Sequence, residues 1–233
     1  MATKTIHKDE YKIVIEEGQV LAPQQIDEAD VMVQMARSKL QTAEILVRTA
    51  YMKPTVARYL KTFFNLTGSV KDAGFVQGVL TVTDNINTLI GAVNSKDLEL
   101  QPLVVTDETA DAAAFVRRGA VGYLMEKVRL PDPNKPATDF YGPLNLRFDR
   151  LFPVGTAAAN LIHEASHRYI GTRDWAYLPN YDLVTWENDM TQAGIALSAP
   201  KSINAIKSWY EMSTAEALNN ADSYGGFCMH VTD

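Results

Sequence analysis

Hydrophobic residues recur at three- and four-residue intervals through most of the first hundred positions, which is the spacing of one face of an α-helix. The longest such run covers residues 25–52. A second begins at Pro54, a residue type favoured at the first position of a helix, and a third covers residues 70–93. The segment before residue 25 is interpreted as a short polar arm. The pattern therefore predicts a mainly helical N-terminal part, residues 1–100.

The pattern changes after residue 100. Short, partly alternating apolar runs are separated by Gly, Asp and Pro, which is typical of strands in a small mixed sheet; these runs cover residues 103–106, 113–118, 120–130 and 143–148. Residues 131–143 hold four of the ten prolines and are expected to form a surface loop. Helical spacing returns at Gly155 and Thr156, the expected N-cap, and again after Asp182, Pro200 and Ser213. We therefore expect one α+β domain over residues 1–233, with the sheet and the candidate chemistry in residues 101–233.

The composition allows one sizeable core and narrows the class of protein. Of the 233 residues 46% are hydrophobic, and the net charge of −6 comes with Lys and Arg scattered singly, which disfavours nucleic acid and anionic membranes as partners. No apolar run is long enough for a secretory signal or a membrane span. The single cysteine, Cys228, excludes an intramolecular disulfide and is expected to be a small buried residue. We expect a protein made in the cytoplasm and, if it acts elsewhere, exported by a dedicated secretion system.

Candidate chemistry is concentrated in HEASHRYIGTRDWAY, residues 163–177. His163 and His167 are four positions apart in a segment expected to be helical as far as Gly171. Because residues i and i+4 project from one face, both imidazoles can bind one zinc ion at about 2.0–2.1 Å. Glu164 would then lie beside the coordination position left for water and act as general base. The pattern predicts a hydrolase with one catalytic Zn²⁺; the alternative is two histidines on an ordinary helix.

A catalytic zinc needs a third protein ligand, and three candidates stay open from spacing alone. Asp174 follows the turn expected at Gly171. Glu187 lies twenty residues beyond His167, a spacing similar to that of thermolysin-type enzymes. A third histidine ligand would have to be His230, since no other histidine follows.

Three segments resemble one known family. GTRDWAY, residues 171–177, resembles the Gly-Thr-x-Asp-x-x-Tyr signature of the aspzincin metallopeptidases, the family of deuterolysin and the lysine-specific metalloendopeptidases. NNADSYGGF, residues 219–227, resembles a segment near the C-terminus of that family. FYGPLNLRFDRLF is similar to the strand and loop before its zinc helix. The similarity extends from about Phe140 to Phe227, whereas residues 25–95 agree only in being helical.

This resemblance implies a zincin-like fold, with His163, His167 and Asp174 as the zinc ligands, Glu164 as the general base and Tyr177 as a donor to the developing oxyanion. It also implies that Asp222 lines a substrate-binding pocket that favours lysine after the cleaved bond. The lysine-specific members carry a second acid three residues further on, where this chain has Gly225.

We therefore expect a zinc-dependent endopeptidase that acts on a protein or peptide substrate. The missing signal and disulfides also fit a bacterial effector or toxin, which would require an immunity or inhibitor protein. Two alternatives are a zinc amidase acting on cell-wall peptides and an inactive metallopeptidase-like binding module. The three tryptophans, Trp175, Trp186 and Trp209, are expected to be core anchors rather than a sugar-binding surface. Arg147 is expected to be an exposed strand residue, with pairing to a substrate backbone as its alternative role.

Overall fold

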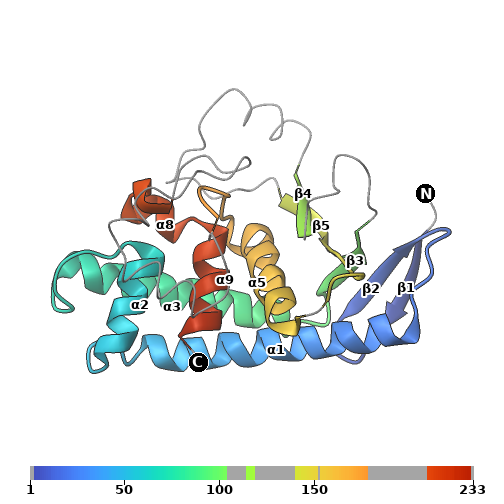
Figure 1. The fold of residues 1–233 in the computed structure, drawn as a ribbon, viewed down its shortest axis with the longest axis horizontal. Coiled ribbons are helices and arrows are strands. Elements are labelled where there is room, and N and C mark those ends of the chain that lie inside the picture. The colour runs from blue at the N-terminus through green and yellow to red at the C-terminus, as the bar shows by residue number, and fades with distance from the viewer. Residues whose placement is uncertain (1–2, 104–113, 119–139, 152, 178–208, 232–233) are drawn as a thin grey trace.

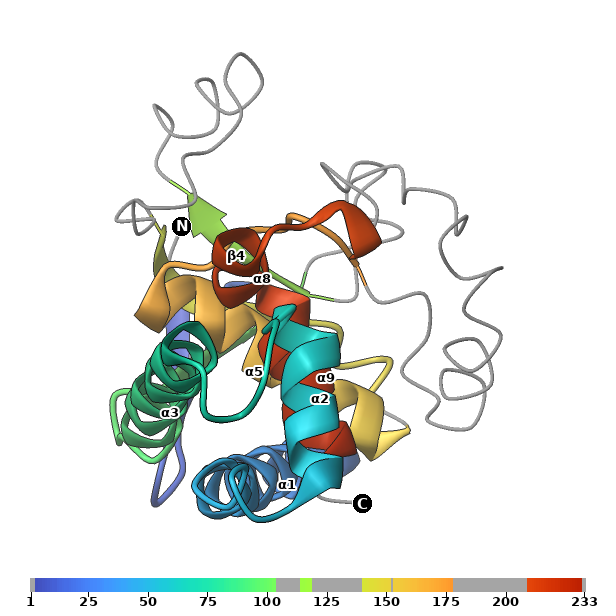
Figure 2. The same ribbon diagram turned by 90° about the vertical axis from the view of Figure 1, so that its left-hand side faces the viewer.

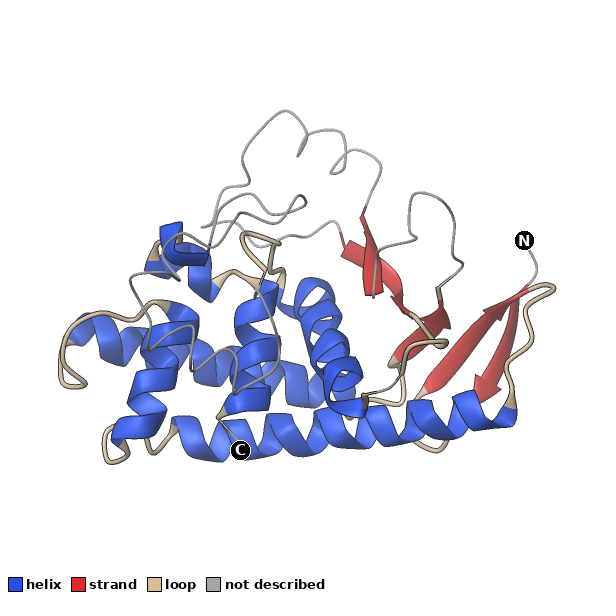
Figure 3. Cartoon of the chain, in the orientation of Figure 1, coloured by secondary structure: helices blue, strands red, loops and turns tan. Residues whose placement is uncertain are grey.

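The structure is a computed structural model that describes residues 3–103, 114–118, 140–151, 153–177 and 209–231. Helices and strands are segregated along the longest helix, α1 (Pro23–Val47). The other helices pack beside one part of α1, and the strands gather near its N-terminal end (Figures 1 and 3). This segregation defines a mixed α+β architecture, as predicted.

The N-terminal segment is not a polar arm but a β-hairpin. Strands β1 (Thr3–His7) and β2 (Lys12–Glu16) pair antiparallel, and β2 also pairs with the later strand β3. Alternation along β2 buries Ile13 and Ile15 while their neighbours stay partly exposed, which is the pattern of a half-buried strand. The prediction for this segment is therefore wrong, because β2 is stabilised by pairing with a strand that lies far away in the sequence.

The three predicted N-terminal helices are confirmed as α1, α2 (Pro54–Phe64) and α3 (Ala73–Val93). Proline at the start of α1 and of α2 has the backbone angle that a first helical turn needs. Arg37, buried on α1, donates to the carbonyl of Val93 at the end of α3 and forms an ion pair with Glu10. These bonds join the hairpin to the helical layer.

The sheet has five described strands in the order β1-β2-β3-β5-β4, where β3 is Glu99–Pro102, β4 is Ala114–Arg118 and β5 is Phe140–Leu146. β3 pairs parallel with both β2 and β5, and β4 pairs antiparallel with β5. The predicted small mixed sheet is confirmed. β3 precedes the strand predicted at 103–106, of which 104–106 lie outside the described residues, and β5 begins earlier than the run predicted at 143–148. The expected strand at 120–130 and most of the expected loop at 131–143 lie outside the described residues.

Helix α5 (Val154–Ile170) lies at the centre of the molecule and packs against α1, α3, α9, β4 and β5 (Figure 2). Its N-cap is Pro153, which has an extended backbone, so the helix begins at Val154, before the N-cap predicted at Gly155 and Thr156. A short 3-10 helix, η1 (Trp209–Glu211), is followed by α8 (Thr214–Leu218) and α9 (Ala221–His230). These confirm helical structure after Ser213; the helices expected after Asp182 and Pro200 lie outside the described residues.

Buried apolar residues from β2, α1, α2, α3, β5, α5 and α9 form one continuous cluster, so both parts of the chain share a core. Within the described ranges no helix combines the length and hydrophobicity that a membrane span requires.

Candidate metal centre

The HExxH segment lies in the second half of α5, where the local sequence favours a helix that packs closely. Its first half is rich in alanine, and Gly171 ends it in the left-handed conformation at φ 72°, as predicted. His163 and His167 are both buried, one turn apart, and their rings cross at 89°. Their Nε2 atoms lie 3.1 Å from each other and therefore face the same point.

The turn after Gly171 brings Asp174 back to the two histidines. Oδ1 of Asp174 lies 3.2 Å from Nε2 of His163 and 3.0 Å from Nε2 of His167. The three donor atoms thus form a nearly equilateral triangle from residues eleven positions apart at most. The side chain of Asp174 is 25% exposed, although its Oδ1 atom, which faces the histidines, is buried.

This triangle has the dimensions that a tetrahedral zinc site requires. With bonds of about 2.0–2.1 Å, neighbouring ligands of a tetrahedral ion lie roughly 3.3–3.4 Å apart, close to the separations of 3.0 to 3.2 Å in the cluster. Two imidazole nitrogens suit zinc and other transition metals, whereas calcium and magnesium take oxygen ligands. Among the described residues, these three therefore fit one zinc ion, and no fourth metal-binding side chain joins them.

Glu164 lies directly beside this cluster. Its Oε1 is 3.8 Å from Nε2 of His163, and its Oε2 is buried with no hydrogen-bond partner among the described residues. A buried carboxylate oxygen without a partner costs free energy, which is expected where a ligand or water completes the site. Burial raises the pKa of Glu164, and the two histidines only partly offset this effect.

Opposite charges within the donor cluster shift the pKa values of its members. Burial alone would lower the pKa of His163, but hydrogen bonds to Asp174 and Asp222 outweigh it and raise the pKa well above its usual value. Burial would raise the pKa of Asp174, but His167 and His163 hold it well below the usual range. Asp174 is therefore ionised beside a protonated imidazole, and a bound cation would take the place of that proton.

The outer ring nitrogen of each histidine has its own acceptor. Nδ1 of His163 lies 2.6 Å from Oδ1 of Asp222, and Nδ1 of His167 lies 2.9 Å from the backbone oxygen of Thr172. A carboxylate and a carbonyl can only accept, so both Nδ1 atoms donate. When each ring is neutral, its lone pair is then on Nε2, toward the centre of the cluster.

Two further predicted residues also lie at the site. The ring of Tyr177 stacks on His163 with centroids 6.1 Å apart, and burial together with Asp174 raises the pKa of its phenol, which therefore stays protonated. Asp222, on the first turn of α9, is 2% exposed and faces His163 rather than solvent.

Sequence reasoning missed the residues that hold the Asp174 turn. Arg173 and Asn220 form a parallel β-bridge. The backbone amide of Arg173 donates to the carbonyl of Asn219 at 2.8 Å, and the amide of Ala221 donates to the carbonyl of Arg173 at 3.0 Å. Oδ1 of Asn220 accepts from the amide of Ala176 at 3.1 Å. In the sequence, Asn219 and Asn220 stand out only as part of NNADSYGGF, the segment that resembles the aspzincins. Nothing in the local sequence indicates which turn they contact.

Asn219 completes this contact from the side of α5. Its amide nitrogen donates to the carbonyl of Gly171 at 3.2 Å, and its Oδ1 accepts from the indole of Trp175 at 3.3 Å. The segment Asn219–Asp222 therefore contacts both the turn that carries Asp174 and the helix that carries the histidines.

Other candidates lie away from the cluster or outside the described residues. His230 stacks on Phe63 in the core, with ring centroids 5.4 Å apart, and does not join the metal-binding group. Cys228 is buried, as expected, and burial raises the pKa of its thiol. Glu187 and Trp186 lie outside the described residues.

Arg147 is not an exposed strand residue. It follows β5, is buried and is paired with Asp149 at 2.6 Å. Moreover β5 is interior to the sheet, with β4 outside it, so Arg147 does not lie on an edge strand. Both predictions for Arg147, an exposed strand residue and a partner for a substrate backbone, are therefore wrong, because the order of strands in a sheet is not visible in the local sequence.

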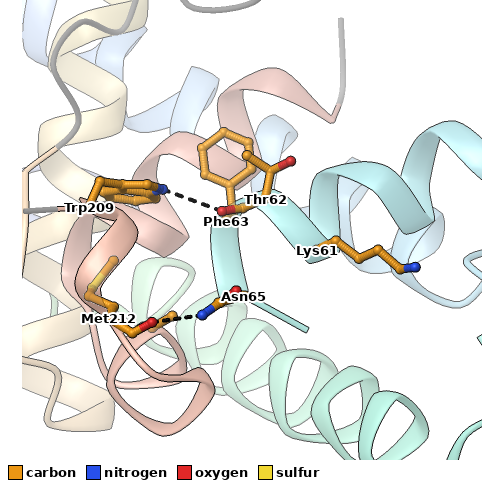
Figure 4. Close-up of a pocket in the computed structure, with 7 residues that line it drawn as sticks. Lys61, Thr62, Phe63, Asn65, Trp209 and Met212 are labelled. Carbon is orange, nitrogen blue, oxygen red and sulfur yellow. Dashed lines mark hydrogen bonds between the residues drawn. The ribbon is translucent and has the colours of Figure 1, made fainter. Parts of the chain in front are cut away.

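Trp175 and Trp209 are core anchors, as predicted. Trp209 also borders a cavity of about 250 Å³ between the end of α2 and η1, where its indole donates to the carbonyl of Thr62 (Figure 4). Asn65 and Met212 lie across the same cavity and are joined by a hydrogen bond of 2.7 Å. None of the metal-cluster residues lines it.

No protein-family model matches the chain, and no curated protein shows a significant match to it. What the site can do must therefore be derived from its own geometry.

Proposed function

We propose that this protein is a zinc-dependent endopeptidase with a zincin-like α+β fold. The observation that carries the proposal is the triangle of donor atoms from His163, His167 and Asp174, at 3.0 to 3.2 Å from one another, with Glu164 beside it. A site that only stabilises structure is normally closed by four protein ligands, whereas three ligands with an adjacent buried carboxylate are typical of hydrolases.

The proposed chemistry assigns one task to each side chain. His163, His167 and Asp174 hold the ion, which when bound supplies Lewis acidity toward the scissile carbonyl and toward a water molecule. Glu164 takes the proton of the attacking water and returns it to the leaving amine. Its raised pKa suits this exchange, because a general base works best when its pKa approaches the working pH. The protonated phenol of Tyr177 donates to the oxyanion that develops during attack.

The sheet supports a peptide substrate. β4 is the outermost of the described strands beyond β5, and α5 packs against both. An extended peptide can add to such an edge through main-chain hydrogen bonds, which fixes its backbone without selecting one sequence. A protein or peptide is therefore the proposed substrate class.

The test compares metal content and cleavage in the same preparations. Wild-type protein loaded with Zn²⁺ is expected to contain about one zinc per chain and to cleave unfolded casein. Glu164→Gln should keep the zinc and lose cleavage by about 10²–10⁴-fold, the contribution of a general base. The matched control is Glu28→Gln on an exposed part of α1, which should behave as wild type.

Two outcomes would overturn this proposal. Zinc bound without any difference in cleavage between wild type and Glu164→Gln would indicate a binding module. Cleavage of peptidoglycan stem peptides but not of casein would indicate an amidase of the cell wall.

A further inference from the structure

We infer that Asp222 is a positioning residue that orients His163 for metal binding, and that it does not select the side chain of the substrate. This inference rests on the proposed metallopeptidase function and concerns how the same site is held.

The contact itself is short and enclosed. Oδ1 of Asp222 lies 2.6 Å from Nδ1 of His163, the ring nitrogen that does not face the donor cluster. Both side chains are buried, at 9% and 3% exposure, so water does not compete for the bond. A carboxylate that accepts from Nδ1 fixes the ring orientation and strengthens Nε2 as a donor to a metal.

The backbone around Asp222 leaves it little freedom to turn toward a substrate. On its N-terminal side, Asn220 is joined to the Asp174 turn through Ala176. On its C-terminal side, Gly225 packs against α5 so closely that an added Cβ would lie 3.0 Å from the carbonyl oxygen of Ala159 and 3.7 Å from Cβ of His163. Asp222 is therefore held on the helix face that meets His163.

The same contact makes a second acid one turn along α9 unfavourable. A side chain at position 225 would start 3.0 Å from the backbone of α5, so that backbone would have to shift. A lysine ammonium meets no pair of carboxylates from this helix, since Asp222 is engaged by His163 and position 225 is a glycine. We expect a cleavage profile without enrichment of lysine after the cut.

The two histidines differ in a way that makes the inference testable. His167 donates to the uncharged backbone oxygen of Thr172, whereas His163 donates to an ionised side chain. Substitution can remove the carboxylate of Asp222, whereas the backbone oxygen of Thr172 stays in place even when its hydroxyl, 3.3 Å from Nδ1 of His167, is removed. Removing such an outer acceptor typically weakens metal affinity by about 10–100-fold.

The experiment measures Zn²⁺ affinity by competition with a chromophoric chelator in the full chain. Asp222→Ala is expected to bind zinc about 10–100-fold more weakly than wild type. Asp222→Asn should fall between the two, because its amide oxygen still accepts from Nδ1 but carries no charge. In parallel, the visible spectrum of the Co²⁺-loaded protein should change in both variants, since the ligand field of His163 changes.

The matched control is Tyr224→Phe, two residues further along α9. Tyr224 is buried and is not one of the three metal-binding residues. The substitution removes its hydrogen bonds to Asn85 and to the carbonyl of Leu218. This variant should unfold at a lower temperature than wild type and keep wild-type zinc affinity. Circular dichroism of all variants checks that each one is folded.

The outcomes separate the two proposals. Wild-type zinc affinity in both Asp222 variants would overturn the positioning role and leave the metallopeptidase standing. A rise in KM confined to substrates with lysine after the cut, at unchanged zinc affinity, would assign Asp222 to substrate recognition instead. A wild-type protein that binds no zinc would overturn the proposed function and this inference with it.

Discussion

Gly225 of α9 lies against the carbonyl oxygen of Ala159 on α5, so that a side chain at position 225 would begin 3.0 Å from a backbone atom. We expect Gly225→Ala to push the two helices apart, which lowers the free energy of unfolding by about 1–3 kcal/mol. The higher helix propensity of alanine offsets about 0.5–1 kcal/mol of this loss. Zinc affinity should fall as well, because Asp222 moves with α9. Urea unfolding and chelator competition measure the two effects.

The control for this substitution is Gly91→Ala. Gly91 is also inside a helix, α3, but an added Cβ meets nothing within 4 Å. This variant should gain about 0.5–1 kcal/mol of stability from helix propensity alone. If both variants shifted stability by the same amount, the tight approach of α9 to α5 would have no energetic importance.

Asn220 is expected to support metal binding through the Asp174 turn. Asn220→Ala would leave the buried amide of Ala176 without its acceptor, which costs about 1–3 kcal/mol. The turn should then hold Asp174 less firmly, and zinc affinity should decrease. Asn85→Ala, which removes a hydrogen bond between α3 and the buried Tyr224, should lower stability alone. Unchanged zinc affinity in Asn220→Ala would mean that the turn holds its shape without this contact.

The stability of the metal-free protein should fall as the pH rises above about 6.5. The folded pKa of His163 is raised above the ordinary histidine value of 6.5, so its contribution is fully present below that pH and is lost as the pH rises through the folded value. Glu164 acts in the same direction, because burial raises its pKa and ionisation opposes folding. Urea unfolding in the presence of a chelator, from pH 3 to pH 9, measures this dependence.

The acidic side of the same profile should be set by Asp174. Its folded pKa lies well below the ordinary aspartate value of 3.8, so its contribution is present above that pH and is lost as the pH falls through the folded value. The metal-free protein should therefore be most stable at about pH 4 to 4.5, above the pH at which Asp174 loses its contribution and below the pH at which ionisation of Glu164 begins to oppose folding. Added zinc should raise stability more at pH 8 than at pH 6, because only neutral imidazole binds metal. A metal-free protein that gains stability from pH 6.5 to pH 8.5 would contradict the pairing of a protonated His163 with an ionised Asp174.

Zinc should stabilise the folded chain only while all three donors are present. At a free zinc concentration about a thousand times the dissociation constant, the free energy of unfolding rises by about 4 kcal/mol, which corresponds to about 8–16 °C in Tm for a chain of this size. Asp174→Asn should lose most of this increment, because a neutral amide is a poor zinc ligand. Differential scanning fluorimetry with and without zinc measures the shift, and Asp97→Asn, on an exposed residue paired with Lys12, should respond as wild type.

The parts of the site that the sequence predicted are those that depend on local geometry. His163 and His167 lie one helical turn apart, and Gly171 ends that helix, so their relation follows from helix periodicity and one stop residue. Asp174 was one of three open candidates by spacing, and only the turn in the structure shows that it reaches the histidines.

The parts that were missed or misread depend on contacts between distant segments. Asp222 reaches His163 across 59 residues, and neither the periodicity of α9 nor the residue type indicates which partner a buried aspartate will have. The hairpin of β1 and β2 was missed because only Ile6 and the short KIVI run suggest strands, and β2 is stabilised by the later β3. The helices α1, α2 and α3 needed no such partner to be recognised, since their hydrophobic stripes extend over several turns.

The late position of Asn219–Asp222 in the chain affects when activity can first appear. A nascent polypeptide synthesised only as far as Leu218 already contains His163, Glu164, His167 and Asp174, but it lacks the acceptor of His163 and the partner of the Asp174 turn. The peptidase that we propose would thus become competent only after Asn219–Asp222 have also left the ribosome and packed against α5 and the turn at Asp174.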